Sequence, residues 1–187
     1  MQTTYVSAED SILLRQVLSE CSGDRFLEIG IGYGSNLKSV AGRFNEIVGT
    51  DIEITEGMRS TVRGRFDIVV ADRASSFRES CFDLVAINPP YLPSREIEDT
   101  AVDGGLQGFQ VPKMFLDDAV RVMKPSGKIL LVLSSETALD LFVDYCKENA
   151  LNIQRVFQKR VFFETLFVFV MRHGRQSNSY QTQAPLS

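Results

Sequence analysis

The sequence predicts an α/β protein: a Rossmann-like sheet of seven mostly parallel strands, with helices on both faces and an antiparallel hairpin at its C-terminal end. Two observations lead to this fold class. Strand-like and helix-like segments alternate from residue 9 to residue 150, as they do in successive β-α-β units. The last two strand-like segments, 152–157 and 163–171, have no long helix between them, so we expect them to pair as a hairpin.

Length and composition favour a single domain. The chain has 187 residues, of which 44% are hydrophobic and 24% are charged, as in an ordinary globular domain. We expect one domain at residues 1–173, followed by a disordered polar tail at residues 174–187. No apolar run reaches the length of a membrane span, and the N-terminus has no signal-peptide pattern.

The cysteines, the histidine and the net charge argue against several kinds of chemistry. The three cysteines lie far apart without metal-ligand spacing, so we expect no metal site and a reduced, cytoplasmic setting. The single histidine, His173, argues against a Ser-His triad. The net charge of −4 argues against autonomous nucleic-acid binding.

The predicted elements follow from local patterns. The first helix has apolar residues at helical spacing from Ile12 to Leu18, a loose start pattern at Ser7 and Asp10, and a stop at Gly23. Further helices are predicted at residues 37–42, 114–123 and 136–150, and residues 53–64 are predicted to form a short helix or a loop. The strands are predicted at residues 25–29, 46–51, 66–71, 82–87, 128–133, 152–157 and 163–171.

The first strand runs into a turn that contains Gly30, Gly32 and Gly34, and then into a helix. Such a corner is typical of nucleotide binding, because glycines let a ligand approach the backbone. The Gly-x-Gly-x-Gly spacing differs from the Gly-x-Gly-x-x-Gly of dinucleotide enzymes. Glu28 lies just before the turn, and a carboxylate there suits a cationic amino-acid group better than a phosphate.

Four strands end in a polar residue. Because the carboxyl ends of parallel strands meet at one edge, where ligands bind, we expect these side chains to converge. Asp51 is placed to hold both hydroxyls of a ribose, and Asp72 to accept from an adenine amino group; helix capping is the alternative for both. The four residues are Glu28, Asp51, Asp72 and Asn88.

The fourth strand ends in Asn88-Pro89-Pro90-Tyr91. Two prolines remove two backbone donors and fix two φ angles, which leaves carbonyl acceptors, one side-chain amide and one aromatic ring. Asn88 Oδ1 and the Pro89 carbonyl suit the N–H groups of a carboxamide or a nucleobase, with Tyr91 against the planar face. The alternative is a plain turn in which Asn88 satisfies the local backbone. The following residues, 92–111, lack periodicity, and we expect a functional loop or lid there.

These motifs together resemble the class I S-adenosylmethionine-dependent methyltransferases that methylate amino groups. The resemblance rests on residues 27–34, Asp51, Asp72 and the Asn-Pro-Pro-Tyr motif, and it covers roughly residues 5–171.

The start of the chain, from Tyr5 to Leu14, resembles the HemK-like release-factor glutamine methyltransferases of the archaeal and eukaryotic type. In that family the segment reads Tyr-x-Pro-Ala-Glu-Asp-Thr. Here Ser7 replaces the proline and Ser11 replaces the threonine. Ser11 keeps a hydroxyl that can reach the cofactor, whereas Ser7 lacks the rigid turn.

The resemblance implies S-adenosyl-L-methionine as the cofactor and N5-methylation of a protein glutamine, such as that of a release-factor Gly-Gly-Gln loop, as the reaction. Glu28 and the glycine turn would hold the methionine end, Asp51 the ribose and Asp72 the adenine. The implied catalytic residues are Asn88, Pro89 and Tyr91, and the implied cofactor-binding residues are Ser11, Glu28, Gly30, Gly32, Gly34, Asp51, Asp72 and Asn88.

The resemblance also implies partners. A release factor is the expected protein substrate, and a small zinc-binding activator subunit of the Trm112 type is the expected partner, bound through the strand edge near residues 66–71 or neighbouring apolar surface.

Three alternatives remain open. A nucleic-acid amino methyltransferase, acting on adenine N6 or guanine N2, shares the same motifs. A nicotinamide oxidoreductase is disfavoured by the glycine spacing and by Glu28. A binding partner without catalytic activity is disfavoured by intact Glu28, Asp51 and Asn88.

Overall fold

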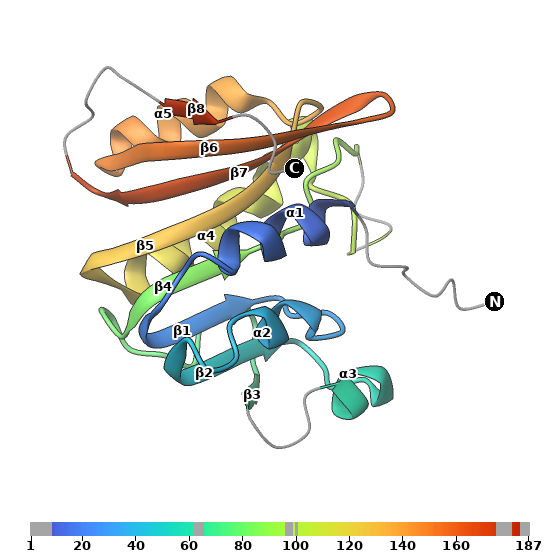
Figure 1. Cartoon of the computed structure of the whole chain (residues 1–187). Helices are drawn as coiled ribbons and strands as arrows, with labels where there is room; N and C mark the ends of the chain where they lie inside the picture. The colour runs from blue at the N-terminus through green and yellow to red at the C-terminus, as the bar shows by residue number, and fades with distance from the viewer. Residues whose placement is uncertain (1–8, 62–65, 96–98, 100, 175–180, 184–187) are drawn as a thin grey trace.

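The computed structural model describes residues 9–61, 66–95, 99, 101–174 and 181–183. It contains one central sheet with helices on both faces (Figure 1), and the strand order is β3-β2-β1-β4-β5-β7-β6-β8. The strands β1 to β5 pair in parallel, and β7 runs antiparallel between β5 and β6. The strands are β1 Gly23–Ile29, β2 Phe44–Asp51, β3 Asp67–Val70, β4 Phe82–Ile87, β5 Met123–Ser134, β6 Leu151–Val161, β7 Glu164–His173 and β8 Gln181–Gln183. The first seven confirm the predicted Rossmann-like sheet and its closing hairpin.

The helices also follow the predicted alternation. They are α1 Glu9–Leu18, α2 Ser35–Ser39, α3 Glu56–Thr61, α4 Gln110–Val122 and α5 Leu139–Glu148, with a short 3-10 helix, η1, at Leu106–Gly108. The α4 helix begins four residues before the predicted start, because Pro112 lies in its first turn, where a missing backbone N–H is tolerated. In the described part of the chain, no helix combines the length and the apolar character that crossing a membrane requires.

Two expectations concern segments that the structure describes only in part. The short helix or loop predicted at residues 53–64 is described only to Thr61, and Tyr5 and Ser7 lie outside the described residues. The tail expected to be disordered contains a short strand, β8, which pairs in parallel with β6 through Gln181 and Arg155. This strand lacks a sequence signal, because three polar residues carry no apolar alternation.

The two faces of the sheet bury two separate apolar clusters. Residues that alternate along β1 and β4 point to opposite sides: Phe26 and Leu84 join the cluster under α1 and α2, whereas Leu27 and Val85 join the cluster under α4 and α5. Both layers fix the carboxyl ends of the central strands, where the candidate site lies.

Candidate active site

The site lies at the carboxyl ends of β1, β2 and β4. The strand register aligns these ends, since Ile29 of β1 pairs with Thr50 of β2 on one side and with Ile87 of β4 on the other. The residues that follow, Gly30, Asp51 and Asn88, therefore lie at the same edge of the sheet. The end of β3 is level with them, since Val70 pairs with Asp51, and this geometry agrees with the predicted convergence of the strand ends.

The glycine turn has a backbone that favours glycine. Gly30, Gly32 and Gly34 have φ angles of 76°, 51° and 72°, in the left-handed region that other residues rarely adopt. Gly30 N–H donates to the Thr50 carbonyl at 2.9 Å, and Gly32 N–H donates to Asp51 Oδ2 at 2.9 Å. These bonds fold the turn against β2.

Glu28 is a buried carboxylate with only part of its hydrogen-bonding capacity used. Asn36 Nδ2 donates to Glu28 Oε1 at 2.7 Å, whereas the buried Oε2 has no partner among the described residues. Burial raises the Glu28 pKa to about 8, an effect that Asn36 and the nearby Arg15 only partly oppose. A buried acceptor without a donor fits a cationic ligand at this point.

The two predicted nucleoside-binding carboxylates differ in their surroundings. Asp51 is half-buried, and its two oxygens accept from the backbone N–H groups of Gly32 and Ile52. Asp72 is 64% exposed and forms an ion pair with Arg73 at 2.8 Å. It follows the end of β3, which is level with the end of β2 because Val70 pairs with Asp51, so it lies at the exposed rim of the same edge.

Asn88 presents a buried acceptor at the exit of β4. Its Nδ2 donates to Ser11 Oγ on α1 at 3.3 Å, which orients the side chain. Its Oδ1 is buried and has no partner among the described residues. Pro89, the next residue, is also buried. The corner therefore offers an oriented amide oxygen to an incoming N–H donor.

Tyr91 is fixed from two sides of the molecule. Its hydroxyl donates to Asp10 Oδ2 on α1 at 3.1 Å, and its carbonyl accepts from Thr137 Oγ1 at 3.2 Å. Sequence reasoning missed Asp10 and Thr137 as site residues, because 81 and 46 residues separate them from Tyr91. Asn36 and Thr50, in contrast, lie next to motifs that the sequence does reveal.

The loop after Tyr91 folds back onto it. Gly104 N–H donates to the Leu92 carbonyl at 2.7 Å, and Leu92 N–H donates to the Val102 carbonyl at 3.0 Å. A Cβ at Gly104 would lie 2.7 Å from Tyr91 Cα, and one at Gly108 would lie 2.3 Å from the Tyr91 carbonyl oxygen. Both glycines thus allow the loop to cover the acceptor corner closely.

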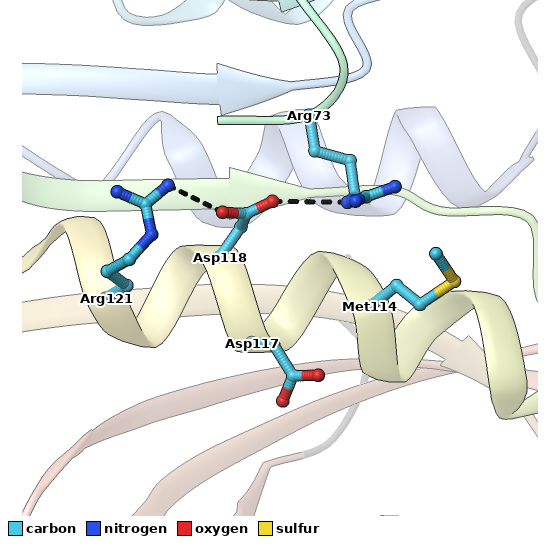
Figure 2. A pocket seen from close by; sticks show the side chains of 5 residues that line it. All are labelled: Arg73, Met114, Asp117, Asp118 and Arg121. Atoms are coloured by element: carbon cyan, nitrogen blue, oxygen red, sulfur yellow. Dashed lines mark hydrogen bonds and ion pairs between the residues drawn. The ribbon is translucent and has the colours of Figure 1, made fainter. Parts of the chain in front are cut away.

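A hollow of about 400 Å³ lies away from this corner, beside α4 (Figure 2). Asp118 forms ion pairs in it with Arg73 at 3.1 Å and with Arg121 at 2.6 Å. Arg121 also donates to the carbonyls of Phe77 and Ala74. These contacts tie the segment after β3 to α4, and they account for the charged lining.

No family model matches this chain. It is 29% identical over 175 residues to a protein named as an N5-glutamine methyltransferase in Methanocaldococcus jannaschii, covering 88% of this chain and 89% of the relative. It is 30% identical over 130 residues to the release factor glutamine methyltransferase of Bradyrhizobium diazoefficiens, covering 57% of this chain but only 42% of that protein.

A solved structure matches over almost its whole length. It is that of the Mtq2-Trm112 complex of E. cuniculi, described as responsible for methylation of the translation termination factor eRF1. The matched chain has a TM-score of 0.74 and 25% identity, and the match covers 91% of this chain and 98% of that one. Other structures of the same fold contain AdoMet or S-adenosylhomocysteine.

The sheet order, the glycine turn and the Asn-Pro-Pro-Tyr corner, together with these similarities, define the chain as a class I S-adenosylmethionine-dependent methyltransferase. Within that class it is a homologue of the protein N5-glutamine methyltransferases.

Proposed function

We propose that this enzyme transfers a methyl group to the side-chain amide nitrogen of a protein glutamine, with a release factor as its substrate. The observation that carries the proposal is the buried Asn88 Oδ1, an acceptor oriented by Ser11 and left without a partner among the described residues. A primary amide has two N–H donors, so it can satisfy Asn88 Oδ1 and the Pro89 carbonyl together.

The residues of the chain fit S-adenosyl-L-methionine. Glu28 Oε2 is a buried acceptor that would take the ammonium of the methionine moiety. Asp51 would hold the ribose hydroxyls at the end of β2, and Asp72 would take the adenine amino group at the exposed rim. The glycine turn between Glu28 and α2 would admit the cofactor to the backbone, and Ser11 would line its pocket from α1.

The chain then has to orient the acceptor and exclude water. The bound cofactor supplies a methyl group that its sulfonium activates. Asn88 and Pro89 would accept from the two amide N–H groups, which favours pyramidalisation of a nitrogen whose lone pair is delocalised and stabilises the positive charge that develops on it. Tyr91 would line the slot, and the described parts of the loop after it, Leu92 to Arg95 and Ala101 to Gly108, would cover it. No residue needs to form a covalent intermediate: the transfer would leave S-adenosylhomocysteine, and the extra proton on the methylated nitrogen would pass to water afterwards.

A small activator subunit is the proposed partner, at the β3 edge of the sheet. The matched structure is a complex with such a protein. In this chain, β3 forms one edge of the sheet, and two large apolar side chains are exposed there: Val70 at 56% and Ile52, just after β2, at 66%. An exposed strand edge with apolar neighbours favours strand addition by a partner.

A nucleobase amino group is the second candidate acceptor. It presents the same N–H donors to Asn88 and Pro89, and exposed Arg160 lies on β6 at the same end of the sheet. The relatives named above favour the glutamine.

The first test has two parts. Calorimetric titration with S-adenosylhomocysteine should give micromolar binding that Asp51→Ala weakens by roughly tenfold or more. Methyl transfer from radiolabelled S-adenosyl-L-methionine to a release factor should then be lost in Asn88→Ala and retained in Asn45→Ala, a matched substitution of an exposed asparagine. Cofactor binding together with transfer to tRNA, and not to the release factor, would favour the nucleobase acceptor.

A further inference from the structure

The turn between β6 and β7 contains residues that a tight hairpin turn does not favour. Val161 and Glu164 form the last pair of the hairpin, so Phe162 and Phe163 make up a two-residue loop. Both rings are exposed, Phe162 by 91% and Phe163 by 100%. Two-residue loops favour glycine, asparagine or aspartate, because one or both positions need a positive φ.

Phe162 occupies such a position, with a φ of 41°. A bulky residue in the left-handed region is rare and strained. The chain therefore carries a backbone cost and two exposed aromatic rings at a site where Asn-Gly would fold better. Aromatic side chains exposed in this way are typical of protein contact surfaces.

The hairpin tip lies at the same end of the sheet as the acceptor corner. The β7 strand runs antiparallel to β5, and Leu166 pairs with Ser134 at the carboxyl end of β5. Figure 1 shows the tip of the β6–β7 hairpin projecting at the end where α1 and the loop after β4 also lie.

A chain of hydrogen bonds connects the hairpin to that corner. Ser135 N–H donates to the Thr165 carbonyl at 2.8 Å, and Thr165 N–H donates to Ser135 Oγ at 3.0 Å. Two residues further on, Thr137 Oγ1 donates to the Tyr91 carbonyl at 3.2 Å. On the other side, Lys159 of β6 forms an ion pair with Glu9 of α1. These contacts connect the strands next to the tip to the segment that contacts Tyr91 and to α1.

We infer that Phe162 and Phe163 form a docking point for the protein that carries the acceptor glutamine. This inference rests on the proposed function. A glutamine side chain is short, so the protein that presents it to Asn88 has to contact the rim of the site. The tip lies at the same end of the sheet as that rim and offers two exposed aromatic rings to an apolar patch beside the glutamine loop. The expected role is in substrate affinity and not in the transfer step.

The test compares a release factor with a short peptide that contains its acceptor loop, using the chain with its activator subunit present. The variant combines Phe162→Gly with Phe163→Ser, which relieves the strained φ and should leave the unfolding temperature unchanged or higher. We expect KM for the release factor to rise roughly tenfold or more, the size typical of an aromatic hot spot. The kcat, the peptide kcat/KM and the S-adenosylhomocysteine affinity should stay within about twofold. Leu141→Ser, at an exposed position on α5, is the matched control.

The other possible outcomes of this test lead to different conclusions. An unchanged KM for the release factor overturns the inference and leaves the proposed function intact. Loss of co-purification with the activator, or a changed oligomeric state, assigns the tip to a different interface and also overturns it. Wild-type enzyme that binds the cofactor but methylates neither acceptor overturns the proposed function, and the docking inference with it.

Discussion

Asn36 donates a hydrogen bond to Glu28 Oε1, while Oε2 of the same buried carboxylate has no partner among the described residues. One half of the carboxylate is therefore satisfied within the protein, and the other half is left for a ligand. Because water is excluded there, the negative charge is unfavourable until a cation arrives. This relationship leads to two predictions about pH.

The first prediction concerns stability. The pKa of Glu28 is raised from 4.5 in the unfolded chain to about 8 in the folded protein. The folded state therefore holds this proton more tightly, and the stability that protonation contributes is present below pH 4.5 and is lost as the pH rises toward 8. Glu28→Gln removes this titration. We expect the unfolding temperature of the variant to rise relative to wild type between pH 4.5 and about pH 8; a constant difference across this range would contradict the pKa shift.

The second prediction concerns cofactor binding. If the ammonium group of the cofactor pairs with ionised Glu28, binding at neutral pH must displace the Glu28 proton, and affinity should increase as the pH rises through about 8. Calorimetry in buffers with different ionisation enthalpies should show the release of about one proton per cofactor. The buffer dependence should disappear in Glu28→Gln, and the affinity should fall by roughly tenfold or more. Equal proton release in both proteins would assign the proton to another group.

The third prediction concerns the loop that covers the acceptor corner. In Gly108→Ala, the new Cβ would lie 2.3 Å from the Tyr91 carbonyl oxygen at a φ of +71°, so the loop has to move. We expect kcat to fall by roughly tenfold or more, with cofactor affinity within about threefold. Gly42→Ala is the matched control, because Gly42 has a φ of +77° and a Cβ there would meet no described atom within 4 Å. Equal losses in both variants would indicate backbone strain and not displacement of the loop.

The fourth prediction concerns Tyr91 itself. Tyr91→Phe removes the hydroxyl that donates to Asp10, a bond that links the acceptor corner to α1. We expect a loss of about 1 kcal/mol in the free energy of unfolding, measured by urea denaturation. Tyr33→Phe, at a half-exposed ring, should change the free energy by less than about 0.5 kcal/mol. A similar loss in both variants would mean that the Asp10 contact is not stabilising.

Much of this fold was accessible from local patterns. The apolar runs before Glu28, Asp51 and Asn88 predicted three strands with level ends, because the carboxyl ends of parallel strands meet at one edge. The strand register confirms this for β1, β2 and β4. The contacts that complete the corner were not accessible, since Asp10 and Thr137 reach Tyr91 from distant parts of the chain. For Asp72, the sequence predicted its position after a strand. It could not predict how exposed the side chain is or that Arg73 pairs with it, because both depend on tertiary packing.

The position of α1 has a consequence for synthesis of the chain. This helix precedes every strand of the sheet in the chain, yet its buried residues Leu13 and Leu14 share a cluster with Val168 and Val170 of β7, and Glu9 pairs with Lys159, 150 residues later. The helix therefore completes the burial of its apolar face only after these late strands have been synthesised, and pairings of such sequence separation form slowly. Ser11 and Asp10 contact Asn88 and Tyr91 from this helix, so we expect a nascent chain that lacks the closing hairpin to hold its acceptor corner less firmly.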